Sequence, residues 1–265
     1  MRVIIDGQKL SDPEAVLSVF DWAVVRGYGC FEVVRSYGGR VFRLDQHLDR
    51  LAHSAAVMGL EPPARNDIAE WINLAAATGD GQVRCVLTGG GTDPLYPARP
   101  RTIVTWEPLP ALPESLRIEV RPAPWHPAGR ASELTGAKTL SYAPNMAATR
   151  GARAAGYDDA LLVSDDSVLL EGPAFSIAWF RDGRLETPSL RLHILASITR
   201  FAVLELAADL GYDVHEGSAS DVVALSTLKE VHPVGEAAGV LFSPGDDTAR
   251  LRSAFRRLVA REVGG

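Results

Sequence analysis

Lysine is scarce in this sequence, and one lysine lies where an amine could act as a nucleophile. Of the 27 basic residues, only Lys9, Lys138 and Lys229 are lysines. A chain that uses arginine elsewhere keeps a lysine where an amine is needed, although genome base composition produces the same bias. Lys138 lies in A-K-T-L-S-Y (137–142), among small and apolar neighbours. Desolvation there would lower the pKa of the amine and suit Schiff-base chemistry; a strand-end lysine that points to solvent is the commoner alternative.

Other polar side chains stand where they could bind a charged ring or a phosphate. Glu171 closes the apolar pattern L-L-E-G-P (169–173), either as a solvated strand end or as a carboxylate that keeps a ring nitrogen protonated. Ile198 and Thr199 lie inside a long helical pattern, so backbone amides and a hydroxyl would meet a phosphate only if a helix begins there. Mid-helix packing is the alternative. Arg50 lies on the polar side of another helical pattern, where most arginines are surface residues.

The composition excludes several classes of protein. The 265 residues, 46% hydrophobic and 23% charged, are typical of a globular chain with a sizeable core. A net charge of −6 gives no basic footprint for nucleic acid, and no apolar run predicts a membrane span or secretory leader. Cys30 and Cys85 are far apart, so we expect two buried thiols, no metal site and a cytoplasmic small-molecule enzyme.

The candidate residues lie on or between predicted strands and helices, which would determine where their side chains point. Strands are expected at 3–5, 29–37, 83–88, 101–106, 116–122, 160–164, 168–171, 176–180, 212–215 and 222–226. Helices are expected at 44–58 (capped by Asp45), 66–78, 147–155, 190–210 and 250–261. Without regular β-α alternation, this pattern predicts an α+β fold. Prolines within 108–113 predict a linker at 108–114, between an N-terminal α+β domain at 1–107 and a C-terminal α+β domain at 115–265 that carries Lys138.

Taken in order, the motifs form a specific pattern. G-Y-G-C-F-E-V-V-R (27–35), F-R-L-D-Q-H-L-D-R-L (42–51), the Lys138 segment and H-P-V (232–234) span most of the chain. The sequence resembles the class IV aminotransferase family of pyridoxal 5'-phosphate (PLP) enzymes, fold type IV. This family includes branched-chain aminotransferases, D-amino-acid transaminases, R-selective amine transaminases and 4-amino-4-deoxychorismate lyases. The resemblance implies two α+β domains with PLP between them, usually in a homodimer whose partner closes the site.

The resemblance also implies a role for each candidate residue. Lys138 matches the Schiff-base lysine that moves the substrate proton, and Glu171 matches the carboxylate paired with the pyridine nitrogen. Tyr142 resembles the tyrosine near the phenolic oxygen of the cofactor. The residues that match phosphate-binding positions are Arg50, Ile198, Thr199 and Thr227.

Three departures from the family pattern bear on these roles. The usual G-D-G reads Gly27-Tyr28-Gly29, the glycine before the I-T pair is Ser197, and the small-residue run after Glu171 reads P-A-F-S (173–176). Ser197 is expected to perturb the phosphate site. The departures remove none of the matched catalytic groups, so the cofactor assignment stands.

The reaction is harder to assign than the cofactor. The R-x-H carboxylate clamp of D-amino-acid transaminases is absent from the loop at 89–100, where Arg99 and Arg101 are the alternative carboxylate ligands. G-C-F and K-T-L-S-Y resemble the 4-amino-4-deoxychorismate lyase branch, which eliminates pyruvate to give 4-aminobenzoate for folate biosynthesis. The sequence therefore favours that lyase over a transaminase of D-amino acids, branched-chain amino acids or small amines. A PLP-binding regulatory protein without turnover is the alternative from another class, and the lysine–glutamate pair argues against it.

Overall fold

The computed structural model describes residues 2–11, 14–92, 95, 98–216, 222–237, 240–241 and 245–264. These residues form two compact units. The first comprises Met1–Pro110, Gly136–Tyr142 and Glu262–Gly265, and the second comprises Ala111–Thr135 and Ala143–Arg261. The first boundary, between Pro110 and Ala111, falls inside the expected linker at 108–114.

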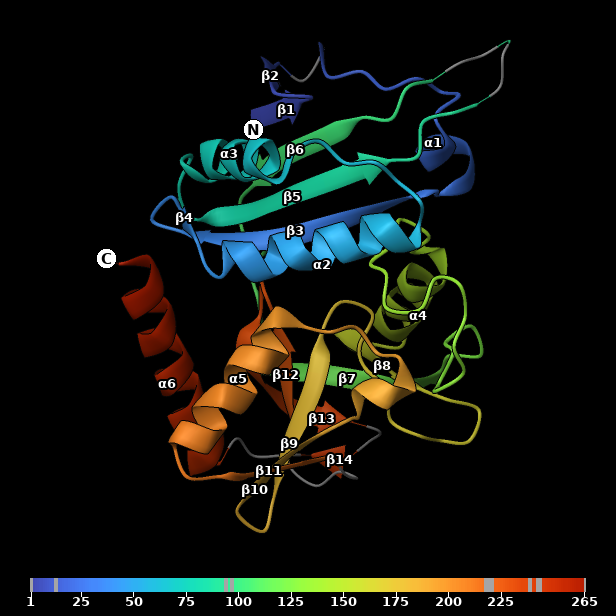
Figure 1. Cartoon of the computed structure of the whole chain (residues 1–265). Coiled ribbons are helices and arrows are strands. Elements are labelled where there is room, and N and C mark those ends of the chain that lie inside the picture. The colour runs from blue at the N-terminus through green and yellow to red at the C-terminus, as the bar shows by residue number, and fades with distance from the viewer. Residues whose placement is uncertain are drawn as a thin grey trace. The chain divides into compact units, whose positions relative to one another are not determined.

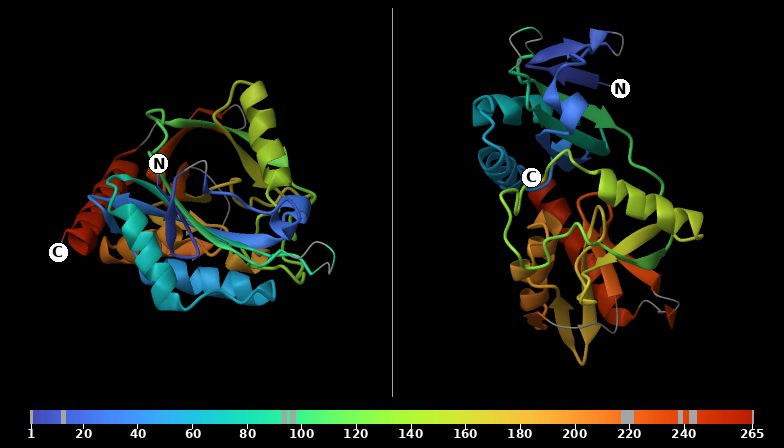
Figure 2. Two further views of the ribbon diagram at one scale, coloured as in Figure 1. Left: turned by 90° about the horizontal axis from the view of Figure 1, so that it is seen from above. Right: turned by 90° about the vertical axis from the view of Figure 1, so that its right-hand side faces the viewer.

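A six-stranded antiparallel sheet forms the centre of the first unit (Figure 1). In the order β2-β1-β6-β5-β3-β4, its strands are β2 (Gln8–Leu10), β1 (Arg2–Ile5), β6 (Thr102–Glu107), β5 (Gly81–Thr88), β3 (Gly29–Tyr37) and β4 (Arg40–Val41). Helix α1 (Trp22–Arg26) precedes β3. Helices α2 (Leu44–Val57) and α3 (Arg65–Ala76) lie on the same face of this sheet (Figure 2).

Periodicity explains this packing. Strand β5 alternates buried and half-buried residues, as expected for a strand with one face against a core. Helix α2 buries Leu48, Leu51 and Ala55, which lie on one face and join the core around Val34 and Val104. The expected cap of α2 is wrong, because Arg43 occupies the cap in a left-handed conformation and Asp45 lies inside the first turn.

A mixed sheet forms the centre of the second unit. Among the described residues its order is β11-β10-β9-β12-β13-β7-β8, with β14 beside β13. The strands are β7 (Leu116–Pro122), β8 (Asp159–Val163), β9 (Ser176–Arg181), β10 (Arg184–Thr187), β11 (Asp213–Glu216), β12 (Val222–Ser226), β13 (Glu230–Ala237) and β14 (Val240–Leu241). Helix α4 (Ala143–Ala154) packs on β7 and β8, α5 (Ile198–Asp209) packs on β11 and β12, and α6 (Asp246–Val263) ends the chain. The core contains Trp179, which is fully buried and donates to Glu186.

The long helix expected at 190–210 is two elements. A single 3₁₀ turn, η2 (Leu190–Leu192), ends at His193 in a left-handed conformation, and α5 begins afresh at Ile198. The hydroxyl of Ser197 accepts the backbone N–H of Arg200 and caps α5. This local bond competes with helix continuation, because serine at an N-cap satisfies an amide that a continuous helix would bond internally. The segment at 168–171, expected as a strand, is not one of the assigned strands, although it bridges Val163 at Leu169 and exchanges backbone hydrogen bonds with Leu162 through Leu170 and Glu171.

The Lys138 segment groups with the first unit, although the sequence places it in the C-terminal domain. The N–H of Phe31 donates to the Lys138 carbonyl at 2.9 Å, and the N–H of Leu140 donates to the Gly29 carbonyl at 2.8 Å. Residues 136–142 therefore extend along β3 as an additional short pairing, centred on the bridge between Cys30 and Thr139. Contiguity in sequence does not reveal this return, because the segment pairs with a strand more than 100 residues away.

The two cysteines and the described helices agree with the sequence expectations for thiols and membrane spans. Both cysteines are buried and unpaired by any disulfide, as expected. Burial, with a smaller effect from Glu32, raises the pKa of Cys30 to about 12. Within the part of the chain that is described, no helix is long and apolar enough to cross a membrane.

Candidate active site

Lys138 lies over aromatic rings in the first unit. Its Nζ is 4.5 Å from the ring centroid of Phe31 and 5.5 Å from that of Tyr142. The two rings meet edge to face, with centroids 5.5 Å apart. Phe31 projects from β3 and Tyr142 ends the lysine segment, so the strand pairing described above brings all three side chains together. The structure thus places two residues expected from the sequence, Lys138 and Tyr142, at one point.

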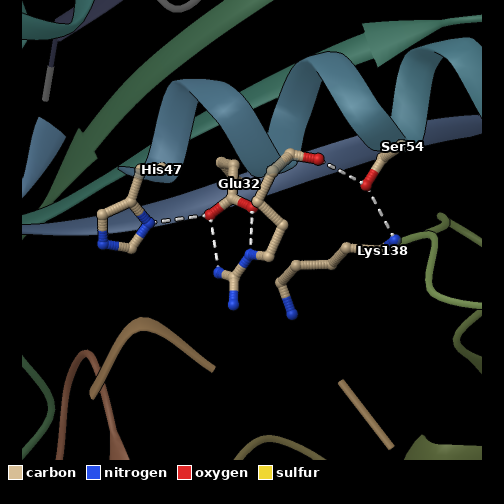
Figure 3. Close-up of polar contacts among 5 residues, drawn as sticks. Glu32, His47, Ser54 and Lys138 are labelled. Carbon is tan, nitrogen blue, oxygen red and sulfur yellow. Dashed lines mark hydrogen bonds and ion pairs between the residues drawn. The ribbon is translucent and has the colours of Figure 1, made fainter. Parts of the chain in front are cut away.

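Arg50 is largely enclosed rather than on the surface, with 9% of its side chain exposed. Its Nε and Nη2 donate to the two carboxylate oxygens of Glu32 at 2.6 and 2.8 Å. The Nδ1 of His47 lies 2.9 Å from the same carboxylate (Figure 3). Glu32 comes from β3, whereas His47 and Arg50 lie on one face of α2, three residues apart. Two parallel hydrogen bonds between a guanidinium and a carboxylate fix the orientation of Arg50 in addition to the attraction between the two charges.

Burial and charge set the protonation states in this cluster. Burial alone would raise the pKa of Glu32, but the charge and hydrogen bonds of Arg50, with help from His47, lower it to about 2. Burial lowers the pKa of His47 from its ordinary value, and this outweighs the opposite effect of Glu32. At neutral pH the cluster therefore contains a carboxylate, a guanidinium and a neutral imidazole.

The glycines at 27 and 29 have separate structural reasons. Gly27 ends α1 in a left-handed conformation with φ of 65°, which glycine adopts at low cost. A Cβ at Gly29 would lie 2.5 Å from the Leu87 carbonyl and 2.7 Å from the Leu140 side chain. Gly29 thus lets the lysine segment approach β3 closely. The departure at Tyr28 leaves both of these requirements intact.

Glu171 lies in the second unit, where backbone groups hold it. Its Oε1 accepts the N–H of Leu195 at 3.1 Å and lies 3.8 Å from His126 Nε2. Its backbone carbonyl accepts the N–H of Leu162 in β8. The Phe175 ring lies so close to Gly172 that a Cβ there would be 2.1 Å from it. Phe175, one of the residues that differ from the family pattern, therefore leaves room only for glycine at position 172.

Ile198 and Thr199 are the first two residues of α5, and both are buried. The helix start that the sequence left open is real, so the first amides of α5 and the Thr199 hydroxyl lie at the positive end of a 12-residue helix. Ser197 caps this helix, and its expected effect on the phosphate site stays a prediction. Thr227 lies half-buried in the turn between β12 and β13.

The two arginines proposed as carboxylate ligands share a partner. Arg101 Nε lies 2.6 Å from Asp6 Oδ2, and Arg99 Nη2 lies 3.3 Å from the same oxygen. Their charge is therefore partly neutralised within the first unit. Asp93, Pro94, Tyr96 and Pro97 of the same loop lie outside the described residues.

The other two lysines differ from Lys138. Lys9 is exposed on β2. Lys229 lies in the second unit, 3.7 Å from Asp159 Oδ2 and over the Phe175 ring at 5.0 Å. Burial lowers its pKa, opposed by Asp159. Lys229 has an internal carboxylate partner, so the scarcity of lysine alone does not distinguish the reactive amine.

These donor sets fit PLP chemically. The first unit supplies an amine over aromatic rings and a fixed guanidinium. The second unit supplies a carboxylate, a helix N-terminus and a threonine turn. An amine, anion donors and a carboxylate match the aldehyde, phosphate and pyridine nitrogen of the cofactor, respectively.

Sequence reasoning missed Glu32, His47, Ser54 and Phe31 as parts of the site. Glu32 lies within the motif G-Y-G-C-F-E, and its position between Phe and Val predicts only a strand residue. A signal is present in the sequence, because a glutamate flanked by Phe31 and Val33 in a strand faces the core and then requires a cationic partner. Arg50, in the helix that follows, is that partner.

The comparisons with known proteins assign the class and then the family. Residues 29–236 match the family model described as amino-transferase class IV. A structure titled a hypothetical aminotransferase from Mycobacterium tuberculosis, PLP-bound form, superposes with a TM-score of 0.90 at 26% identity, covering 98% of this chain and 99% of that one. This protein is therefore a two-sheet α+β, fold type IV, PLP-dependent enzyme. It belongs to the class IV aminotransferase family.

Two curated relatives illustrate the range of reactions. A putative branched-chain-amino-acid aminotransferase from Methanocaldococcus jannaschii is 29% identical, over 97% of this chain and 96% of its own length. A bifunctional aminodeoxychorismate lyase / D-amino acid transaminase from Mycobacterium tuberculosis is 31% identical, over 80% of both chains. Transaminases occur in both names, so these findings support the transaminase alternative better than the lyase that the sequence favoured.

Proposed function

We propose that this enzyme is an amino-acid transaminase in which Lys138 binds PLP covalently and moves the substrate proton. The position of Lys138 is the observation that carries the proposal. Its amine lies over Phe31 and Tyr142, on a segment whose backbone is paired with β3. Because the backbone of this segment is held in place, the Lys138 amine stays within reach of one substrate carbon. A group that removes and returns a proton at that carbon requires such a fixed position.

Each remaining residue has a role toward the cofactor in this proposal. Bound PLP supplies an electron sink that makes the α-proton of an amino acid acidic. Arg50, the first amides of α5 with Ile198 and Thr199, and Thr227 bind the phosphate. Glu171 would keep the pyridine nitrogen protonated, and Tyr142 would face the phenolic oxygen. The fixed orientation of Arg50 and the cap on α5 support these roles.

Aminodeoxychorismate lyase is the second candidate. The Mycobacterium tuberculosis relative supports it, because its name combines the lyase with a D-amino acid transaminase. Both reactions begin by removing the same type of proton, so Lys138 and Glu171 serve either one. The reactions differ in whether the cofactor receives the amino group or the substrate loses pyruvate.

The test is a spectroscopic titration of the purified protein. D-alanine, L-leucine or L-glutamate is added without a keto-acid acceptor, and the visible band of lysine-bound PLP is followed. Conversion to the pyridoxamine form by a donor supports the transaminase. A band that persists with every donor, with pyruvate released from aminodeoxychorismate, supports the lyase instead.

A variant tests the lysine itself. Lys138→Ala is expected to abolish both the visible band and turnover, whereas Lys9→Ala, a change at an exposed lysine, is the control. Full activity in Lys138→Ala would overturn the assignment. Absence of the band in the wild-type protein supplied with PLP would count against covalent cofactor binding by Lys138.

We further propose that two copies associate. Large apolar side chains are exposed along a short stretch of the first unit, at Val16, Val19, Val24 and Val25. Such exposure is typical of a surface covered by another protein. Light scattering during gel filtration measures the mass in solution, and a monomer at micromolar concentration would contradict this proposal.

A further inference from the structure

Ser54 connects the two expected cofactor ligands of the first unit. This serine lies on α2, one turn after Arg50, and is fully buried. Its hydroxyl donates to the backbone carbonyl of Arg50 at 2.9 Å and accepts the backbone N–H of Lys138 at 3.0 Å. Figure 3 shows the Ser54 hydroxyl beside the backbone amide of Lys138.

The first of these bonds is ordinary for a helix. A serine hydroxyl inside a helix commonly donates to the carbonyl four residues earlier. That bond uses the hydroxyl hydrogen and leaves the oxygen lone pairs available as acceptors. Donation to the Arg50 carbonyl also fixes the torsion of the hydroxyl, so its acceptor side has one direction. The Lys138 amide occupies that side.

The second bond is what needs explanation. Lys138 and Leu140 pair with β3, because Phe31 donates to the Lys138 carbonyl and Leu140 donates to the Gly29 carbonyl. A continued antiparallel ladder would direct the Lys138 N–H back to the carbonyl of Phe31. The Lys138 N–H instead donates to a helix residue 84 positions earlier in the chain. The ladder therefore ends at the lysine, and a side chain of α2 takes its last amide.

This arrangement fixes the position of Lys138 relative to Arg50. Glu32 holds the Arg50 guanidinium at two points, and Ser54 holds the Lys138 backbone to the same helix turn. A rigid cofactor that binds at both its phosphate and its aldehyde requires a fixed separation between these ligands. Strand pairing alone fixes the Lys138 segment relative to β3, whereas Ser54 fixes it relative to α2.

We propose that Ser54 is a positioning residue for the reaction: its hydroxyl sets the place of Lys138 relative to Arg50, so that one PLP molecule reaches both. The inference rests on the proposed roles of these two residues. Ser54 touches neither cofactor nor substrate in this account and acts only through the backbone groups of its partners.

The central comparison is between Ser54→Ala and Ser36→Ala. Ser36 is the matched control, because it is also fully buried in the first unit and donates to backbone carbonyls, those of Gly79 and Gly81. It belongs to none of the proposed cofactor contacts. Both variants lose a buried hydroxyl, but only Ser54→Ala releases the Lys138 amide.

The first measurement needs no cofactor. Amide hydrogen exchange of residues 136–142 is followed in PLP-free protein. Loss of one hydrogen bond is expected to speed exchange of the Lys138 amide about two- to tenfold in Ser54→Ala, with no change in Ser36→Ala. Unchanged exchange in Ser54→Ala would overturn the proposal. If Ser54→Ala does not fold, Ser54→Cys retains a weaker donor and acceptor and is expected to give a smaller increase.

The second measurement concerns the bound cofactor. Ser54→Ala is expected to shift the pH at which the visible band of lysine-bound PLP titrates, and to lower kcat about ten- to hundredfold with KM little changed. Ser36→Ala is expected to change neither. Equal effects of the two variants would show general destabilisation and overturn the positioning role. Failure of the proposed function has a different signature, which is absence of the band in wild-type protein.

Discussion

In the first unit Arg50 depends on buried charged side chains, whereas in the second unit Glu171 and Thr199 depend on backbone amides and a cap. Glu32 pairs with Arg50 and His47 inside the core of strand β3 and helix α2. Glu171 accepts one amide from Leu195, and α5 begins where Ser197 caps it. Both arrangements hold a polar group in place, but they respond differently to mutation.

The difference lies in what remains after one partner is removed. A buried ion pair that loses one member leaves an uncompensated charge in the interior, which is costly. A cap that is lost exposes an amide that water or a neighbouring turn can satisfy in part. The stability of the first unit should therefore be sensitive to single substitutions in this cluster and to acid, and that of the second unit should be more tolerant.

The largest effect is expected for Glu32→Gln. This change leaves Arg50 buried without its carboxylate and should lower the free energy of unfolding by about 3–5 kcal/mol. Asp49→Asn is the control, because it removes an exposed ion pair between Asp49 of α2 and Arg65 of α3 and should cost about 0–1 kcal/mol. Urea unfolding followed by tryptophan fluorescence measures both. A loss for Glu32→Gln no larger than for Asp49→Asn would show that the buried cluster contributes little.

An intermediate effect is expected on acidification. The folded-state pKa of His47 is lowered, so below its ordinary value near 6.5 the unfolded chain takes up a proton that the folded chain excludes. Glu32, whose pKa is lowered to about 2, adds the same effect below about 4.5. The contribution of His47 to stability is therefore present above pH 6.5 and is lost on acidification, as the unfolded chain takes up the proton that the folded chain excludes.

His47→Asn isolates this contribution. The variant starts from a lower stability, because it loses the contact with Glu32, but its unfolding free energy should change less between pH 7 and 5.5. Urea midpoints at the two pH values supply the comparison. An identical slope in the variant and the wild type would assign the acid sensitivity to other groups.

The smallest effect is expected at Ser197. Ser197→Ala removes the cap of α5 and should cost about 1 kcal/mol, whereas Ser197→Gly, which restores the residue usual in the family, should cost only a few tenths. PLP affinity should follow the same order if the start of α5 binds the phosphate. Equal affinity in both variants and the wild type would separate the cap from cofactor binding.

The sequence predicted the strands and helices better than the side-chain contacts between them. Strands 29–37 and 116–122 follow from β-branched and aromatic runs bounded by turn residues, and both match the structure. The helix at 190–210 was wrong because apolar spacing continues across Ser197, and spacing does not reveal a local bond from a side chain to a backbone amide. The cluster around Arg50 was missed because it joins a strand and a helix whose pairing depends on the assembled core. The roles of all the candidate residues toward the cofactor, those of Lys138 and Arg50 included, remain predictions.

The composition of the first unit has a consequence for synthesis. Its sheet and helices are complete in Met1–Pro110, but it also includes Gly136–Tyr142 and the C-terminal residues, where Arg40 donates to the Val263 carbonyl and Arg43 pairs with Glu262. A growing chain emerges from its N-terminus at about 5–20 residues per second. The ribosome therefore produces the arginine cluster early, the lysine segment later and the contacts of Arg40 and Arg43 last of all. The proposed covalent binding of the cofactor would therefore wait for a segment that the nascent sheet cannot supply by itself.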